Sequence, residues 1–343
     1  MVFTAKIKFL LRIAICLMLA ISPLAAQDSI SLVGSGSNLV NSLFSEWMSE
    51  FGKLHPILQV NYLSLGTSQS INEIRGGAGD FGAGEVPLTE AQRHGGKYAL
   101  VQFPADLVAI VPIYRLPGDP QLRLSGDLLA EIFFGNIKNW KDSRITKLNP
   151  TVTLPDLPIT VVHLVGVKGS NYILTDFLSK TSPEWESRIG KSSSPKWPVG
   201  QETGRSDGMV DKVAATPGAI GYVEFNYARR KSIGYGSLQN AAGQFVKPST
   251  SSITAACESF EKSMPEDFKI SMTNAAGKES YPMVSFTWIY LPASGLPQTR
   301  SRALKDFWSW ALTDGQQVAS RLGYAPLPAG IALKAQKTLN SIQ

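Results

Sequence analysis

Three short loops of this 343-residue chain combine glycine with hydroxyl side chains, and each separates a predicted strand from a predicted helix. They span residues 34–38, 66–70 and 166–170, and their hydroxyl groups include those of Ser37, Thr67, Ser68 and Ser170. The first turn of a helix leaves backbone N–H groups unpaired and carries partial positive charge, so it attracts anions. Three such helix ends that converge would bind a small oxyanion. The competing interpretation is that each loop is an ordinary βα turn whose Ser or Thr caps the helix.

The elements that must position these loops alternate along the chain, as in an α/β protein. Residues 31–33, 60–65 and 159–165 are the predicted strands. The first loop precedes a predicted helix with apolar residues at Leu39, Leu43, Phe44, Trp47, Met48 and Phe51. A short helix is predicted to begin at Ile71 and a third after Ser170. The chain is 43% hydrophobic and 17% charged, which excludes a disordered chain, and its length predicts about two domains.

The first 26 residues have the composition of a secretory signal peptide. Basic residues are followed by an apolar run over 13–21 and by small residues over 22–26, so we expect the mature chain to begin at Gln27. The apolar run is too short to span a membrane. Cys16 lies inside the apolar run after the bulky Ile15, which favours simple cleavage over a lipid anchor. The mature chain then keeps only Cys257 and has no internal disulfide.

Charge and motif content exclude several classes of function. Without residues 1–26 the chain has 30 basic and 27 acidic residues, too small an excess for nucleic-acid binding. Residues 204–208 match G-x-S-x-G, but all three histidines precede that motif, so a serine hydrolase is not expected. His163 is expected to be a packed residue in an apolar strand. We expect no metal, no cofactor and no catalytic step.

Several stretches resemble the periplasmic phosphate-binding proteins of phosphate-specific ABC importers. The most specific is PGAIGYVEFNYA at residues 217–228. Supporting stretches occur in the same order at 80–83, 87–88, 102–104, 132–140, 147–150 and 196–200. The resemblance covers nearly the whole mature chain. It implies a periplasmic or secreted, monomeric protein that captures inorganic phosphate or a related oxyanion and delivers it to a membrane permease.

The resemblance also implies a fold, the two-domain type II periplasmic-binding-protein fold, with the ligand cleft between the domains. One domain would hold residues 27–106 and 284–343, and the other residues 107–283. Two crossing segments near Asp106 and Met283 would form the hinge. Such proteins close on their ligand like a hinge.

The anion-binding positions implied by the resemblance depart from the family pattern. They are Ser37, Asn38, Thr67, Ser68, Glu85, Lys168, Gly169 and Ser170. Asn38 replaces a donating Thr, and Glu85 replaces the Asp that accepts a proton from hydrogen phosphate. The fourth loop lacks the family's Arg and its Asp partner, and Lys168 stands where the family has Ser. Lys168 could restore the positive charge and pair with Glu85, and Arg205 is a second candidate.

Two other functions stay open at this level. The chain could be a diverged receptor for a phosphonate or a phosphate ester. It could also be a secreted sensor or accessory protein that keeps the fold without taking part in transport.

Overall fold

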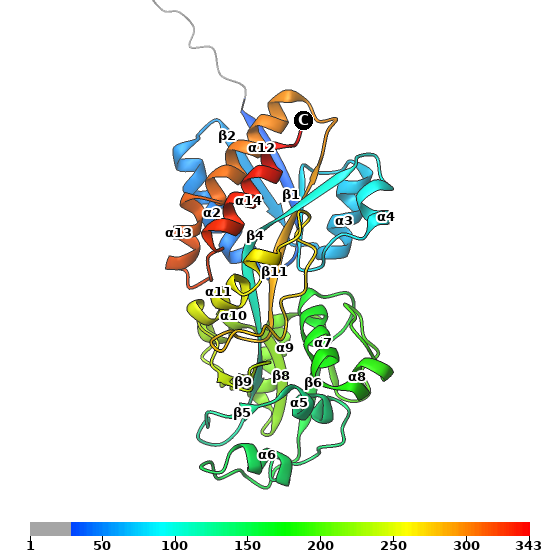
Figure 1. Cartoon of the computed structure of the whole chain (residues 1–343), viewed down its shortest axis with the longest axis vertical. Coiled ribbons are helices and arrows are strands. Elements are labelled where there is room, and N and C mark those ends of the chain that lie inside the picture. Colours follow the sequence, from blue (N-terminus) through cyan, green and yellow to red (C-terminus); the bar gives the residue numbers. More distant parts are fainter. Residues whose placement is uncertain (1–28) are drawn as a thin grey trace, which may run out of the picture.

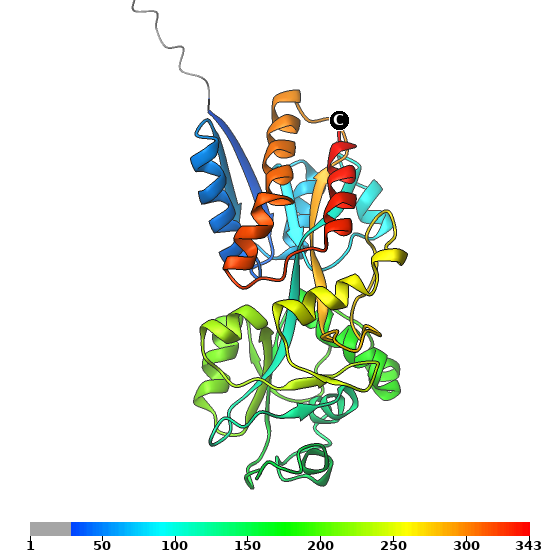
Figure 2. The same ribbon diagram turned by 60° about the vertical axis from the view of Figure 1, so that its left-hand side comes forward.

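The computed structural model describes residues 29–343, which form two lobes connected at a narrow waist (Figures 1 and 2). The upper lobe of Figure 1 contains both ends of the described chain. Its elements are β1 (Ile30–Gly36), α2 (Asn41–Leu54), β2 (Leu58–Leu63), α3 (Thr67–Gly76), β3 (Phe81–Gly84), α4 (Glu90–His94), α12 (Gln298–Ala311), α13 (Asp314–Arg321) and α14 (Ala329–Asn340). The predicted signal peptide and its cleavage site lie outside the described residues.

The lower lobe holds the middle of the chain. Its elements are β5 (Arg123–Leu124), α5 (Gly126–Phe133), α6 (Ser143–Leu148), β6 (Thr160–Leu164), α7 (Gly169–Thr181), α8 (Pro183–Arg188), β7 (Gln201–Thr203), α9 (Ser206–Ala215), β8 (Ala219–Glu224), α10 (Phe225–Arg230), β9 (Ser237–Gln239) and β10 (Phe245–Val246). Helix α11 (Thr250–Glu258) and the 3₁₀ turn η1 (Glu261–Ser263) lie at the waist, beside the upper lobe in Figure 2.

One sheet runs through both lobes, in the strand order β2-β1-β3-β11-β4-β8-β6-β7. Strand β4 (Leu100–Tyr114) is long enough to take part in both halves. Its first part pairs antiparallel with β11 (Val284–Pro292), and its last part, from Ile110, pairs antiparallel with β8. The mixed α/β class predicted from the sequence is therefore confirmed, and β4 and β11 connect the two lobes (Figure 1).

The upper core is built from helix faces with apolar periodicity. Of the residues that predicted the first helix, Leu43, Phe44, Trp47 and Phe51 are buried on α2, whereas Leu39 and Met48 are only partly buried. Leu39 differs because α2 begins two residues later, at Asn41. Phe44 and Trp47 pack on the fully buried Trp308 of α12, with ring centroids 5.6 and 6.5 Å away.

Several boundaries differ from the sequence prediction. Strand β2, predicted over 60–65, begins and ends two residues earlier, at Leu58 and Leu63. Two other differences lie at glycines. Strand β1 continues through Gly36, beyond the predicted end at 33, because Gly34 packs directly on the ring of Phe81, where any side chain would overlap. Helix α3 begins at Thr67 rather than Ile71, directly after Gly66, whose φ of 90° favours glycine.

His163 is a packed residue, as predicted, because it is buried and its ring stacks on Trp197.

A segment of residues 264–273, here called the strap, contacts both lobes. At one end the Met264 carbonyl oxygen accepts a hydrogen bond from Lys334 Nζ of α14 at 2.6 Å. The Asp267 carbonyl oxygen accepts one from Gln102 Nε2 of β4 at 2.8 Å. At the other end Lys180 Nζ of α7 donates to the Thr273 carbonyl oxygen at 2.8 Å. The strap therefore connects α7 in the lower lobe with α14 and β4.

None of the helices within residues 29–343 has the length and apolar character needed to cross a membrane.

Candidate anion-binding site

The structure brings six of the predicted site residues to one cavity between the lobes. This anion cavity has a volume of about 40 Å³, and its walls include Ser37, Asn38, Thr67, Lys168, Gly169 and Ser170. The first three follow strands or begin helices of the upper lobe, and the last three belong to the lower lobe. The predicted convergence of the three loops on one site is therefore a feature of the structure.

The upper wall is fixed by the ends of β1 and β2. Ser37 N–H donates to the Ala83 carbonyl oxygen at 3.0 Å, and its own carbonyl oxygen accepts from Tyr62 Oη at 2.9 Å. Its Oγ accepts from Leu39 N–H at 3.1 Å. Thr67 is the first residue of α3, so its backbone N–H has no partner within the helix. Both residues are buried and line the cavity.

The lower wall is the N-terminus of α7, where Lys168 is the N-cap and makes no capping hydrogen bond with its side chain. Gly169 and Ser170 follow with backbone N–H groups that lack helical partners. The loop before them is held by Asn171, whose Nδ2 donates to the carbonyl oxygens of Leu164 and Gly166 at 3.2 and 3.3 Å. The Asn171 Oδ1 in turn accepts from the buried Tyr222 hydroxyl. This helix end therefore presents ordered donors to the cavity.

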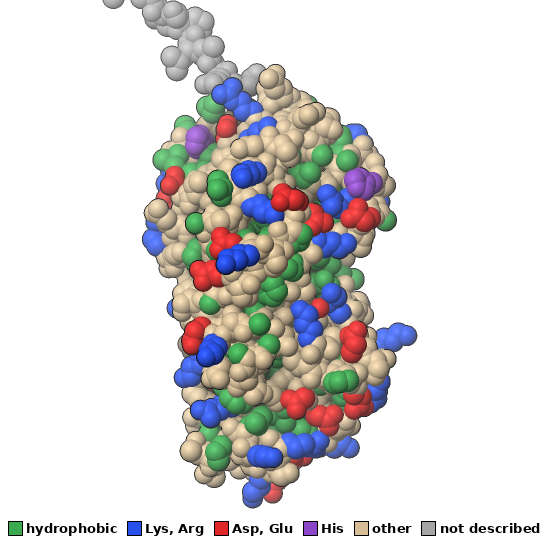
Figure 3. All heavy atoms as spheres, viewed as in Figure 1, with side chains coloured by type: hydrophobic (Ala, Val, Ile, Leu, Met, Phe, Trp, Pro, Cys, Tyr) green, Lys and Arg blue, Asp and Glu red, His purple; other side chains and the backbone are tan. Residues whose placement is uncertain are grey.

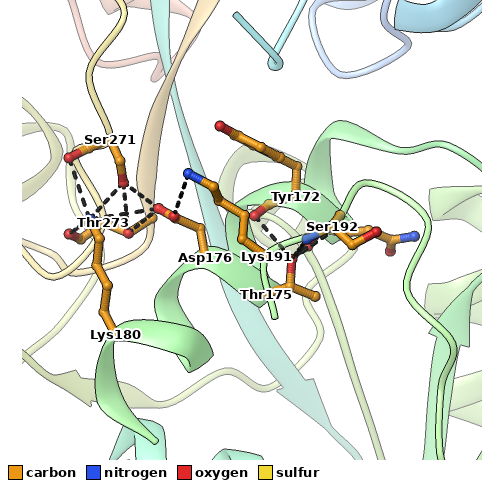
Figure 4. Close-up of polar contacts among 9 residues, drawn as sticks. Tyr172, Thr175, Asp176, Lys180, Lys191, Ser192, Ser271 and Thr273 are labelled. Carbon is orange, nitrogen blue, oxygen red and sulfur yellow. Dashed lines mark hydrogen bonds and ion pairs between the residues drawn. The ribbon is translucent and has the colours of Figure 1, made fainter. Parts of the chain in front are cut away.

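A polar cluster fixes α7 about two turns after its first residue, Gly169 (Figure 4). Asp176 is buried and accepts hydrogen bonds from the hydroxyls of Ser271 and Thr273 in the strap. Lys191 Nζ lies 3.2 Å from Asp176 Oδ1, and Lys180 Nζ lies 3.7 Å from Oδ2. Burial raises the pKa of Asp176, but the two hydroxyls and the two ammonium groups outweigh it and lower the pKa overall. The carboxylate is therefore ionised and anchors α7.

Glu85 is a predicted site residue that does not line the anion cavity, but it is fully buried and packs against Gly169, which does line it. Burial raises its pKa to about 7, while the hydroxyls of Ser37 and Thr287 favour the ionised form. Thr287 Oγ1 is 3.5 Å from Glu85 Oε1, and Oε2 has no hydrogen-bond partner within residues 29–343. Gly169 packs so closely on this side chain that a Cβ there would overlap Glu85 Oε2. A buried oxygen without a donor at such a contact can accept a hydrogen bond from a ligand that carries a proton.

One charge prediction for this site differs from the structure, and a second candidate is found at the cavity. The predicted pair of Lys168 with Glu85 is not among the ion pairs of the described chain, and the Gly169 backbone packs against the Glu85 carboxylate. Arg205, whose place at the site was left open, lines the anion cavity. Its side chain is 69% exposed, and its Nε lies 3.5 Å from Asp207 Oδ1. The cavity wall therefore has two cations, Lys168 and Arg205.

Ser68 does not line the anion cavity, and its side chain is exposed. The sequence placed it in a loop, but it is the second residue of α3. Conversely, Ser206 lines the cavity and was not predicted as a site residue. It is the first residue of α9, and its Oγ donates to Glu224 Oε1 at 2.9 Å. The G-x-S-x-G match at 204–208 contains this helix start, which could have indicated a fourth loop of the same kind.

Comparisons with known proteins agree with this arrangement. A family profile described as a PBP superfamily domain matches residues 23–315. The phosphate-binding protein PstS of Haemophilus influenzae is 37% identical over 318 residues, which cover 91% of this chain and 93% of that protein. PstS of Xylella fastidiosa is 35% identical and covers 90% of this chain and 85% of its own.

Solved structures of phosphate-binding proteins share the fold. PfluDING, a periplasmic phosphate-binding protein bound with phosphate, aligns with a TM-score of 0.71 at 16% identity and covers 90% of this chain and 93% of its own. A substrate-binding protein of a phosphate ABC transporter from Clostridium perfringens aligns with a TM-score of 0.63 at 17% identity, covering 87% and 100%. These matches confirm the predicted family and the two-lobed type II fold. The chain therefore belongs to the PBP superfamily and, within it, to the family of the PstS phosphate-binding proteins.

Proposed function

We propose that this chain is an exported substrate-binding protein that captures inorganic phosphate and delivers it to the permease of an ABC importer. The observation that carries the proposal is the anion cavity, which is lined by hydroxyl residues and helix N-termini from both lobes and includes Gly169, the residue that packs on the buried Glu85. Its PstS relatives, at 35 and 37% identity along most of the chain, support phosphate as the ligand. The protein acts as a monomer in the periplasm and catalyses no reaction.

The residues divide the work of binding between neutral donors and two cations. Ser37, Thr67 and Ser170 donate through hydroxyl groups, and Asn38 through its amide. Gly169 contributes a backbone N–H group at the start of α7, whereas Ser68 does not line the cavity and is given no role. Lys168 supplies the main positive charge, because the charge of the Arg205 guanidinium is partly balanced by the nearby Asp207 carboxylate. Glu85 accepts the proton of hydrogen phosphate and thereby disfavours sulfate, which carries none.

Titration calorimetry of the mature, phosphate-stripped protein tests the proposal. We expect phosphate and arsenate to bind and sulfate to bind much more weakly. Lys168→Ala should weaken phosphate and arsenate alike by roughly 10- to 100-fold, because a charge-assisted hydrogen bond contributes about 1.5–3 kcal/mol. The matched control is Lys278→Ala, since Lys278 is an exposed lysine between the strap and β11 that does not line the cavity. Absence of phosphate binding at millimolar concentration would refute the proposed function.

The two domains proposed from the sequence are compatible with this mechanism. Their boundaries at 106 and 284 fall on β4 and at the start of β11, the strands that connect the lobes. We propose that the lobes close on phosphate by bending at these strands, so that Glu85 and Gly169 approach each other from opposite sides.

A further inference from the structure

A larger cavity adjoins the anion cavity along the same interlobe groove. This side chamber has a volume of about 190 Å³ and shares Asn38, Leu39, Arg205 and Ser206 with the anion cavity. Its remaining walls include Asn41 and Ser64 of the upper lobe and Glu224 and Asn226 of the lower lobe. A buried water needs only about 10–15 Å³ on the same kind of measure, so the side chamber has room for a chemical group of several atoms.

Two acceptor atoms in the wall of the side chamber lack donors. Glu224 is only 7% exposed, and its Oε1 accepts from Ser206 Oγ at 2.9 Å. Its other oxygen, Oε2, has no hydrogen-bond partner within residues 29–343, and neither has Asn226 Oδ1. Leaving a buried acceptor unpaired is unfavourable, and more so for a charged group. The chamber is therefore built to receive donors.

The cations near Glu224 do not supply them. Arg205 Nε lies 3.5 Å from Asp207 Oδ1, and its side chain is largely exposed. The Arg230 guanidinium lies 5.5 Å from the centroid of the Tyr227 ring. Burial raises the pKa of Glu224, and the hydrogen bond from Ser206 and the charge of Arg230 offset this only in part. Arg205 and Arg230 also line the side chamber, but neither donates a hydrogen bond to Glu224 Oε2, so a cationic ligand group would provide the donor that this oxygen lacks.

We propose that the side chamber binds the ammonium group of a short aminoalkyl phosphonate or phosphate monoester whose phosphoryl head occupies the anion cavity. An ammonium group has three donors and no acceptor, which matches a carboxylate oxygen and an amide oxygen on one wall. The proposal rests on the proposed function in one respect, since it needs a phosphoryl oxyanion in the anion cavity. It extends the ligand range from inorganic phosphate to substituted phosphates.

Calorimetry of the mature protein with three probes tests this inference: inorganic phosphate, 2-aminoethylphosphonate and propylphosphonate. The last two have chains of similar length, and only the first of them carries an amine. We expect 2-aminoethylphosphonate to bind at least ten times more tightly than propylphosphonate. Glu224→Gln places an amide N–H where Oε2 stands and should reduce this affinity ratio to about one. Asn226→Ala, which leaves Glu224 and Ser206 in place, should reduce the ratio by a smaller factor.

The outcomes separate the two proposals. Phosphate binding with equal affinities for the two phosphonates would overturn the side chamber as an ammonium site and leave the proposed function intact. Tight binding of 2-aminoethylphosphonate without phosphate binding would support the side chamber as an ammonium site and overturn the proposed function. A ratio that persists in a folded Glu224→Gln protein would overturn the role of Glu224. Binding of none of the three probes would overturn both proposals.

Discussion

Gly169 offers the sharpest test of how the two lobes meet. It is the first residue of α7 in the lower lobe, and it packs against Glu85, which follows β3 in the upper lobe. Its φ lies outside the left-handed region, so alanine is acceptable to the backbone there. Gly169→Ala should therefore leave the backbone conformation unchanged and alter only the contact between the lobes, where it inserts a methyl group at the anion cavity.

The magnitude follows from the contact distances. The added Cβ would overlap Glu85 Oε2 and lie 2.7 Å from Glu85 Cβ, whereas ordinary contact begins at 3.4 Å. Rotating the Glu85 side chain relieves the first contact but not the second, because the Cβ position is fixed by the backbone. The lobes must therefore separate by at least about 0.7 Å. Overpacking of this kind typically costs about 1–3 kcal/mol, so phosphate affinity should fall roughly 5- to 150-fold.

The assay combines calorimetry with phosphate and urea unfolding of the ligand-free protein. We expect Gly169→Ala to lose affinity without lowering the free energy of unfolding, since the ligand-free lobes can open to accommodate the methyl group. Gly52→Ala is the matched control, because Gly52 lies in α2 and an added Cβ meets no atom within 4 Å. Equal phosphate affinity of Gly169→Ala and the wild type would refute the reasoning that this contact closes on the ligand.

Three further predictions concern Glu85, Asp176 and processing. Burial raises the pKa of Glu85 from 4.5 to about 7, so the folded protein keeps a proton that the unfolded chain releases. The free energy of unfolding of the wild type, measured relative to that of Glu85→Gln, should therefore fall by up to about 3 kcal/mol as the pH rises from about 4.5 to about 7. Urea midpoints that shift by the same amount in both proteins between pH 5 and pH 8 would contradict this. Asp176→Asn should lower the free energy of unfolding by about 1–3 kcal/mol, because it weakens the hydrogen bonds from Ser271 and Thr273 and the ion pairs with two lysines. The control is Glu184→Gln, which removes an exposed ion pair with Arg188 and should cost less than about 0.5 kcal/mol. Equal losses of stability in the two variants would show that the buried cluster does not stabilise the fold. Mass spectrometry of the exported protein should find Gln27 at its N-terminus, and an intact Met1 would disprove the assigned signal peptide.

The sequence predicts the anion cavity well where local rules apply. Glycine and hydroxyl residues at a strand-to-helix junction are local signals, and Ser37, Thr67 and Ser170 of these junctions do line the cavity, whereas Ser68 does not; their roles in anion binding stay predictions. Apolar periodicity likewise predicted the buried face of α2. Both signals depend only on neighbours a few residues away.

Other features depend on contacts across the fold and could not be read from the sequence. Arg205 and Ser206 reach the cavity because β6 and β7 pair side by side and bring the start of α9 next to α7. The expected Lys168–Glu85 pair fails for a similar reason, since the position of the Gly169 backbone is set by how the lobes meet. On the face shown in Figure 3, acidic and basic side chains are interspersed, and a cavity of this kind leaves no trace in such surface charge.

The strap has a kinematic consequence for any movement of the lobes. Two strands that cross a waist side by side define a single axis and leave rotation about it free. The strap is a further connection, held to α14 and β4 at Met264 and Asp267 and to α7 at Thr273. A rotation about the β4–β11 axis must therefore change the span between these anchors. Because Ser271 is also bonded to Asp176 and Lys180 of α7, only the residues from Phe268 to Ile270 can absorb the change. The lower anchor is α7, the helix whose first turn lines the anion cavity. Displacement of α7 and the conformation of this short span are therefore geometrically coupled, and the range of opening is limited by the length of the span.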